Sequence, residues 1–225
     1  MGVIKTFSEF INESIWSDMQ DRSSGETVRK EDLITTNEDL RNKILELYKE
    51  QGEGETLDVS SLTDFIKCDD FSNLFRRFYK VEHIIGLEDW DISKVTNMRG
   101  MFRDCRKFNS DLSKWDVSNV ENMREMFWDC QTFNSDLSKW DVSSVGDMEG
   151  MFYNCKTFNS DLSNWNVSSV ENMECMFHSC DNFNSDLSNW NVSSVKKIGG
   201  VKKMGNMFYK CQSLEQIPSW YYTHY

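Results

Sequence analysis

The chain has 225 residues and a formal net charge of −12, from 25 lysines and arginines against 37 aspartates and glutamates. An acidic surface of this size repels phosphate backbones, which argues against general nucleic-acid binding. Three histidines and no Cys-x-x-Cys pair leave little for catalysis or a structural zinc, and no apolar run is long enough to span a bilayer. The length fits one domain with a small appendage.

The first 19 residues are predicted to form a leader or an amphipathic helix, because apolar side chains recur on one helical stripe from Phe7 to Ile15. The segment Lys5–Glu13 resembles the capsid-targeting leader of internal head proteins in large tailed bacteriophages. Those leaders end in an Ile/Leu-x-Glu site, which implies cleavage before Ser14. The residues of the implied processing motif are Ile11, Asn12 and Glu13. No secretory h-region is present, so the localisation stays open and a cytoplasmic or virion-associated protein is favoured.

A polar linker is predicted over residues 20–35, followed by a capping helix over residues 36–56. Thr36 supplies an N-cap, and Leu40 and Ile44 mark one apolar face. A helix with a single apolar face before a repeat array is expected to cover the first repeat. The alternative for the extreme N-terminus is the targeting leader described above.

Residues 57–220 repeat with a step of 25 residues, which gives about six to seven units and leaves 221–225 as a tail. Tryptophan, cysteine and Met-Phe pairs recur with the same step. The hexapeptide Phe-Asn-Ser-Asp-Leu-Ser starts four times, at Phe108, Phe133, Phe158 and Phe183. The last unit is six residues longer, and the extra residues fall around 196–201. Degenerate end units are typical of repeat arrays, because terminal units must cap the core.

Two periodicities alternate inside one repeat. From Val120 to Cys130 apolar residues recur every three to four positions, which predicts a short helix. At 140–142 the pattern is apolar-polar-apolar, which predicts a short strand. One strand and one short helix per repeat predict an α/β array.

The string Met-Phe-x-x-Cys-x-x-Phe, followed by Leu, Trp, Val, Val and Met, resembles the BspA-type leucine-rich repeat. The segment Cys211–Pro218 is closer still to that form, and the 25-residue variant resembles the DUF285 subfamily. This resemblance implies a right-handed solenoid with a parallel sheet on one face and short helices on the other. The helix predicted to begin at Thr36 would be its N-terminal cap. It implies no chemistry, because the family is defined by its fold.

Two columns of reactive side chains have both a structural and a chemical interpretation. The cysteine column is expected to hold buried thiols, although stacked cysteines lie at a separation compatible with disulfides. The aspartate column is expected to accept hydrogen bonds from turn N–H groups, with calcium binding as the alternative. The aspartates are Asp111, Asp136, Asp161 and Asp186. Neither a metal nor another cofactor is expected.

One position changes from repeat to repeat, directly after each Met-Phe pair, and this makes it the candidate recognition column. Its residues are Arg103, Trp128, Tyr153, His178 and Tyr209. A basic island is predicted to be either a solvated loop or a contact for an anionic partner. Its residues are Lys196, Lys197, Lys202 and Lys203.

The sequence therefore predicts a non-enzymatic scaffold that binds another protein or a surface macromolecule. The alternative is a structural component of a virion or cell surface, either associated with a phage head or adhesin-like, with a cleavable leader. No transmembrane segment is expected, and the sequence makes no prediction of the oligomeric state.

Overall fold

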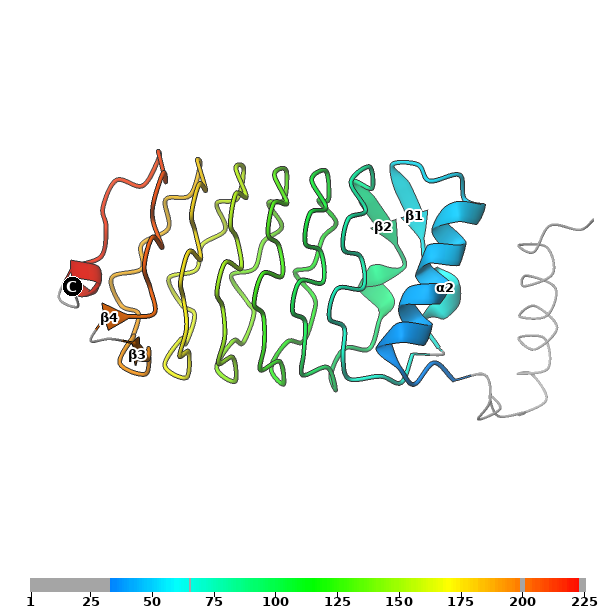
Figure 1. Cartoon of the computed structure of the whole chain (residues 1–225), viewed down its shortest axis with the longest axis horizontal. Helices are drawn as coiled ribbons and strands as arrows, with labels where there is room; N and C mark the ends of the chain where they lie inside the picture. The colour runs from blue at the N-terminus through cyan, green and yellow to red at the C-terminus, as the bar shows by residue number, and fades with distance from the viewer. Residues whose placement is uncertain (1–32, 65, 199–200, 223–225) are drawn as a thin grey trace, which may run out of the picture.

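The computed structural model describes residues 33–64, 66–198 and 201–222, and Figure 1 shows them as a row of stacked coils. One coil corresponds to one sequence repeat. The helix α2 (Asn37–Glu50) lies at one end of the row, and the short helix α3 (Ser219–Tyr222) lies at the other. The predicted leader and its processing motif lie outside the described residues.

Neighbouring coils are joined by a backbone ladder in which every second residue donates its N–H to the next coil. Met98 donates to the Asn122 carbonyl and Phe102 to the Met126 carbonyl, each at 2.9 Å. Between them, the Met101 N–H bonds back to the Met98 carbonyl at 3.2 Å and closes a tight turn. We call these stretches donor segments; they are residues 71–77, 98–104, 123–129, 148–154 and 173–179. Residues 204–210 are the equivalent segment of the last coil, where no further coil follows.

The prediction of short helices inside the repeats is wrong. Residues 120–130 consist of turns and extended links, and the backbone is left-handed at Glu125 (φ 56°) and Asp129 (φ 60°). An α-helix needs φ near −63° at every residue and a bond from each N–H to the carbonyl four residues back. Here alternate N–H groups bond to the next coil instead, so the segment cannot close helical turns.

The parallel pairing is narrower than predicted and lies elsewhere in the repeat. The strand β1 (Thr56–Asp58) pairs in parallel with β2 (His83–Ile85). Later coils are connected by single parallel bridges, one residue per coil. The bridged residues are Asp70, Asn97, Asn122, Asp147 and Asn172. The fold is thus mixed, with few helices and a small parallel two-stranded sheet.

The strand predicted at 140–142 is a sequence of turns. The Val145 N–H bonds to the Val142 carbonyl, and the Ser143 N–H bonds to the Asp141 carboxylate, each at 3.0 Å. These local bonds use the donors that a sheet would need. Outside the donor segments, 3-10 helices occur at Ser60–Leu62 and Leu87–Asp89 in the first coils.

The core consists of columns of like side chains, each contributed once per coil. The Phe102 and Phe127 rings stack with centroids 5.6 Å apart and planes 3° apart. Trp140 is 4% exposed, and its indole N–H donates to the carbonyl of Leu112 in the preceding coil at 3.0 Å. The predicted burial of the tryptophan column is confirmed. The indoles of Trp115, Trp140, Trp165, Trp190 and Trp220 each connect two coils in this way.

The helix α2 occupies the segment for which the sequence predicts a helix. The Thr36 hydroxyl accepts a hydrogen bond from the Asp39 N–H at 3.1 Å, which caps the first turn. Leu40 and Ile44 are fully buried against the first coil. The apolar stripe therefore positions α2 across the end of the core.

The same helix replaces a missing coil. The first donor segment has carbonyls that face away from the array, where no earlier coil donates to them. The Asn37 amide donates to two of them at 3.0 Å each, and the Arg41 guanidinium donates to others. The carbonyls that receive these bonds belong to Asp70 and Ser72 for Asn37, and to Asn73, Leu74 and Arg76 for Arg41. Side chains of α2 thus complete the backbone ladder at this end.

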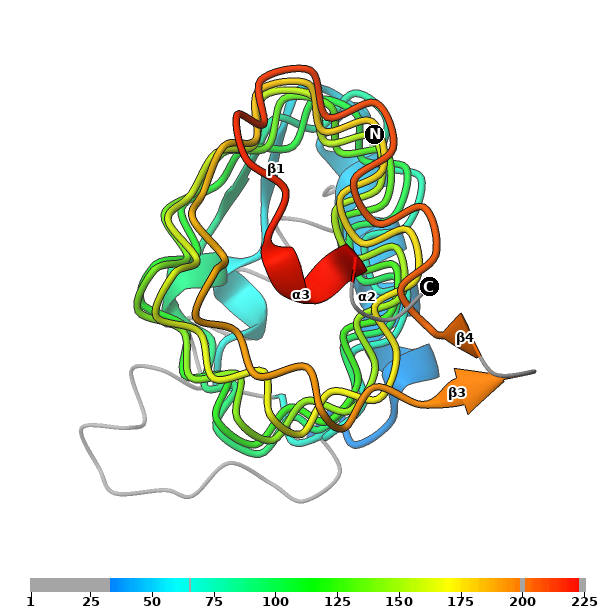
Figure 2. The ribbon, with the colours of Figure 1, turned by 90° about the vertical axis from the view of Figure 1, so that its left-hand side faces the viewer.

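The insertion in the last full repeat contains two short paired strands, which we call the hairpin. The strands β3 (Lys197–Ile198) and β4 (Val201–Lys202) pair antiparallel. Lys196 donates to the Glu171 carbonyl and Met173 to the Lys203 carbonyl, each at 2.8 Å, as in a coil without an insertion. Figure 2 shows the hairpin projecting beyond the outline of the coils, whereas α3 lies inside that outline.

Candidate recognition surface

The five residues that follow the Met-Phe pairs lie in one continuous stack, which we call the variable column. The Trp128 and Tyr153 rings are 3.8 Å apart and 4° from parallel. His178 follows at 4.4 Å from Tyr153, and Tyr209 follows at 5.0 Å from His178 with a tilt of 38°. Arg103 completes the column, with its guanidinium carbon 5.2 Å from the Trp128 ring centroid.

Stacking determines which part of each ring reaches solvent. The side chains of Arg103, Trp128, Tyr153 and His178 are half-buried, and Tyr209 is 53% exposed at the end of the column. Because the ring faces cover one another, the exposed parts of the inner members are ring edges and polar groups. The column is therefore both a contact between coils and part of the surface.

A glycine makes room for Trp128. Gly150 lies in the next coil with φ 59°, and a Cβ atom at this position would be 2.7 Å from the indole ring. Glu125 and Cys175 occupy the equivalent backbone position in the adjacent coils, at φ 56° and 57°. Sequence reasoning did not assign Gly150 this role, although the residue before each Met-Phe pair changes between glycine, glutamate, cysteine and asparagine.

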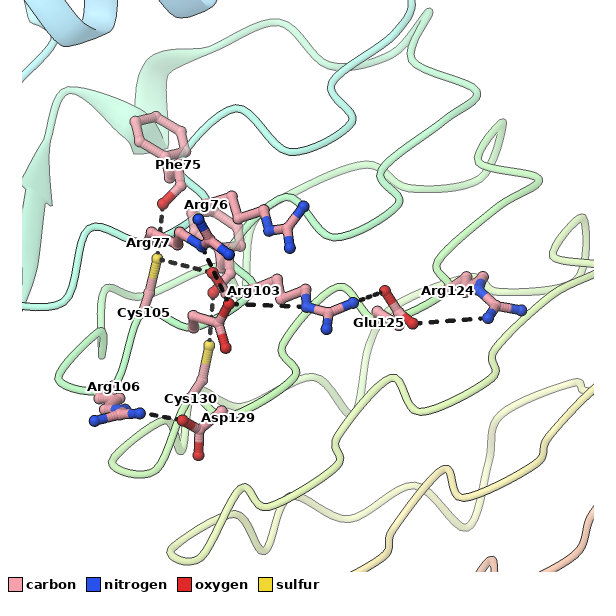
Figure 3. Close-up of polar contacts among 12 residues, drawn as sticks. Phe75, Arg76, Arg77, Arg103, Cys105, Arg106, Arg124, Glu125, Asp129 and Cys130 are labelled. Carbon is pink, nitrogen blue, oxygen red and sulfur yellow. Dashed lines mark hydrogen bonds and ion pairs between the residues drawn. The ribbon is translucent and has the colours of Figure 1, made fainter.

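A ladder of ion pairs runs beside the first half of the column, as Figure 3 shows. Arg103 pairs with Glu125, and Arg124 pairs with Glu149 one coil further on. Arg106 pairs with Asp129 at 2.9 Å. Each pair joins two coils, so the charges beside Arg103 and Trp128 are held in place. Sequence reasoning missed these pairs, because only the coil geometry brings residues 22 to 25 positions apart together.

The second half of the column has a different electrostatic character. Burial lowers the pKa of His178, and the nearby Lys210 ammonium lowers it further. The Ser179 hydroxyl lies 3.0 Å from His178 Nδ1. The Lys210 ammonium is 5.4 Å from the Tyr209 ring centroid. A neutral imidazole between two tyrosines is suited to stacking and hydrogen bonding.

The aspartate column caps turns, as predicted. Asp136 Oδ1 accepts the Ser138 N–H at 2.9 Å, and the same bond recurs at the other three positions. The Ser160 hydroxyl also reaches Asp136 at 3.4 Å. These hydrogen bonds from Ser138 lower the pKa of Asp136. Among the described residues, no group of three His, Cys, Asp or Glu side chains is placed to hold a metal ion.

The cysteine column holds free thiols. The Cys130 thiol donates to the Phe102 carbonyl of the preceding coil at 3.0 Å, and the equivalent bond recurs in four further coils. Burial raises the pKa of Cys105 to about 12. Cys175 lies off this column and is half-buried, and burial raises its pKa as well. Thiolate formation at these positions is therefore disfavoured.

The repeats that form the coils also match a known protein family. A family model described as "Mycoplasma protein of unknown function, DUF285" matches residues 49–156 and 135–224. The two matches overlap, and together they span the coils and more than half of the chain. The chain belongs to the DUF285 family. Membership in DUF285 assigns no activity, because the family description names none.

Two further findings concern this DUF285 chain. No curated protein is similar enough to count as a match. Within the described ranges, no helix has both the length and the apolar character that crossing a membrane requires.

Proposed function

We propose that this DUF285 protein is a non-enzymatic binding scaffold whose variable column contacts another protein. In this proposal the stacked coils are a right-handed, BspA-type leucine-rich-repeat solenoid. The 25-residue period supports it, because leucine-rich repeats have periods of 20–29 residues. The cross-coil ladder supports it as well, since each coil contributes side chains to one continuous surface.

The observation that carries the proposal is the contrast between the variable column and the core columns. Core positions repeat the same residue type in coil after coil, as the buried phenylalanines and tryptophans do. The variable column changes from arginine through tryptophan, tyrosine and histidine to tyrosine, yet the rings still stack. Arginine, tryptophan and tyrosine are enriched in binding hot spots. Mutual stacking also reduces the entropy that these side chains lose on binding.

The test removes the two central rings. The protein is used as bait in its native source, the captured partner is identified and purified, and its Kd is measured. Trp128→Ala combined with Tyr153→Ala should raise Kd at least tenfold, which corresponds to about 1.4 kcal/mol. Losing the ring contacts should lower the unfolding free energy by about 2 kcal/mol, which corresponds to a Tm lower by about 4–8 °C.

A matched control uses exposed residues of the same coils on other faces. Lys139→Ala combined with Lys114→Ala should leave Kd unchanged, since both side chains are exposed and neither belongs to the column. If the ring variant binds the purified partner as tightly as the original protein, the column serves only packing between coils. The contact surface would then lie on the face that carries Lys139.

A second candidate function rests on the N-terminal sequence. The motif Ile11-Asn12-Glu13 favours a structural component of a virion or cell surface that is processed during assembly. Terminal mass spectrometry of protein from its native source tests this candidate. A chain that begins at Ser14 supports it, and a chain that retains residues 1–13 contradicts it.

A further inference from the structure

Arginines gather at one end of the surface that the donor segments form. The first two donor segments, residues 71–77 and 98–104, carry four arginines and one carboxylate. The next three, residues 123–129, 148–154 and 173–179, carry one arginine and four carboxylates. In a chain with a net charge of −12, the first two segments therefore reverse the overall sign. Their arginines are Arg76, Arg77, Arg99 and Arg103.

Arg76 lacks the carboxylate that its equivalent has. It occupies the same place in the first donor segment as Arg103 in the second, and Arg103 pairs with Glu125 one coil further on (Figure 3). For Arg76, the residue equivalent to Glu125 is Gly100, which has no side chain to offer. Among the described residues, the Arg76 guanidinium lies within ion-pair distance of no carboxylate, and its buried Nε–H has no acceptor.

Arg99 and Arg77 are also incompletely neutralised. Arg124 pairs with Glu149, its equivalent residue in the next coil, whereas the equivalent residue for Arg99 is Arg124 itself. Arg99 is exposed, and no carboxylate of the described chain lies within ion-pair distance of it. The Arg77 side chain is 63% exposed and lies 4.0 Å from the Asp104 carboxylate, which a second arginine shares at 3.8 Å.

The helix α2 adds a fifth arginine beside this group. The Arg41 guanidinium donates to the Arg76 carbonyl at 3.4 Å and to two other carbonyls, so its donors are used by the backbone. Burial lowers the pKa of Arg41, and the positive charge of Arg76 lowers it further. The two guanidinium groups are therefore close enough to repel each other. An external anion would relieve that repulsion.

The neighbouring coils indicate which anion suits these arginines. At the equivalent positions, Arg103 and Arg124 each meet a glutamate side chain. Guanidinium groups bind carboxylates through paired N–H donors. A nucleic acid is disfavoured, because its phosphate backbone would extend beyond the arginines over an acidic protein. We propose that Arg76, Arg77 and Arg99 bind carboxylates of an acidic segment in the partner protein.

This inference rests on the proposed function and adds the chemistry of the partner at the first end of the variable column. The partner would place its acidic segment on the arginines and its remaining contact surface on the rings that begin at Trp128. Arginine pairing with a partner carboxylate gives orientation as well as affinity, because it fixes which end of the column each part of the partner meets.

The test uses the full chain and a fluorescein-labelled hexaglutamate peptide. Fluorescence anisotropy in 50 mM NaCl should show saturable binding, and the matched hexaglutamine peptide should bind at least tenfold more weakly. Arg76→Gln combined with Arg99→Gln should raise Kd for hexaglutamate at least tenfold. Arg99→Gln alone should raise it at least threefold, and this exposed substitution should leave the circular dichroism spectrum and Tm unchanged.

A matched control removes two exposed cations of other positions. Lys114→Gln combined with Lys139→Gln changes the net charge by the same amount and should leave Kd for hexaglutamate within twofold. Trp128→Ala combined with Tyr153→Ala should also leave it within twofold, since the peptide carries no group for the rings. A labelled hexathymidylate strand should bind at least tenfold more weakly than hexaglutamate.

Three outcomes would overturn this inference. They are the absence of hexaglutamate binding up to millimolar peptide, equal weakening by the arginine and lysine pairs, and binding of hexathymidylate as tight as that of hexaglutamate. Each of them leaves the proposed function standing if the ring variant still loses the captured partner. Conversely, a ring variant that binds the captured partner normally contradicts the proposed function without affecting the hexaglutamate result, so the two failures are distinguishable.

Discussion

At the residue scale, neighbouring repeats share their core residues but carry different residues at the positions where the backbone is left-handed. Each donor segment has two such positions, and side chains other than glycine occupy most of them. A left-handed L-residue costs roughly 1–2 kcal/mol. The first position of successive segments holds Asn73, Gly100, Glu125, Gly150, Cys175 and Asn206. This strain is tolerated because ladder bonds on both sides hold the backbone in place.

Two substitutions at this position should have opposite effects. Gly150→Ala should lower the unfolding free energy by about 2 kcal/mol or more, because it adds left-handed strain and a contact with the Trp128 ring. Cys175→Gly should raise it by up to about 1 kcal/mol, since relief of strain exceeds the entropy that glycine adds to the unfolded chain. Urea unfolding measures both. A neutral Gly150→Ala would contradict the backbone assignment.

The turn-capping aspartates should make stability sensitive to acid. Their pKa values are lowered in the folded protein by hydrogen bonds from serine N–H and hydroxyl groups. A lowered folded pKa means that the stabilisation is complete above the unfolded pKa, about 3.9, and is lost as the pH falls through the folded pKa. The unfolding free energy should thus be nearly constant above about pH 5 and decrease below about pH 4.

The matched variant replaces all four aspartates with asparagine. In a different turn of the repeat, Asn166 accepts the Ser168 N–H at 3.2 Å where Asp141 accepts the Ser143 N–H one coil earlier. An asparagine should therefore keep this type of hydrogen bond and remove the titration. Chemical denaturation from pH 3 to pH 7 should show a shallower acid decrease in this variant. The same slope in both proteins would mean that other carboxylates control acid stability.

At the element scale, α2 is the part of the fold that no other element can replace. Its apolar face covers the core, and its polar side chains satisfy the first ladder. Without it, carbonyls that every other coil satisfies with backbone N–H groups would depend on water. An isolated helix of 14 residues is marginal in water, so α2 and the first coil depend on each other.

Arg41→Ala tests this dependence. It removes charged donors from the carbonyls of the first coil and should lower the unfolding free energy by about 1.5–3 kcal/mol. Asn42→Ala changes the next residue, which is exposed, and should stay within about 0.5 kcal/mol of the original protein. Thermal and urea unfolding of the two variants measure the difference. Equal stability would show that the guanidinium contacts contribute nothing to the cap.

At the scale of the whole molecule, the destabilising effect of a substitution in one coil should spread to the neighbouring coils, because each coil is stabilised by contacts with its neighbours. Trp140→Ala in a central coil should cost about 3–5 kcal/mol. Two probes should show the loss in urea unfolding, namely the fluorescence of the remaining tryptophans and far-UV circular dichroism. Lys139→Ala, at the exposed neighbouring residue, should be close to neutral. A cost below about 1 kcal/mol for Trp140→Ala would contradict the burial of this column.

Several features of the protein follow from the sequence alone, because they depend on local chemistry or on strict repetition. The 25-residue step predicts which side chains form columns, and the structure buries the tryptophans and phenylalanines accordingly. The sequence also predicts the apolar face of α2 and the turns that Asp136 and its equivalents cap, because both depend on local chemistry. The six extra residues of the last repeat are likewise visible, since an insertion interrupts the step.

Tertiary structure alone decided how the backbone hydrogen bonds are distributed. The period-three pattern around Met123 and Met126 is consistent with a helix, yet the Met123 N–H bonds to Asp147 in the next coil. A single repeat carries no information about that partner, because the acceptor exists only once coils stack. The stacked rings of the variable column arise in the same way. They follow from the alignment of equivalent residues 25 positions apart, or 31 across the insertion, which no local pattern encodes.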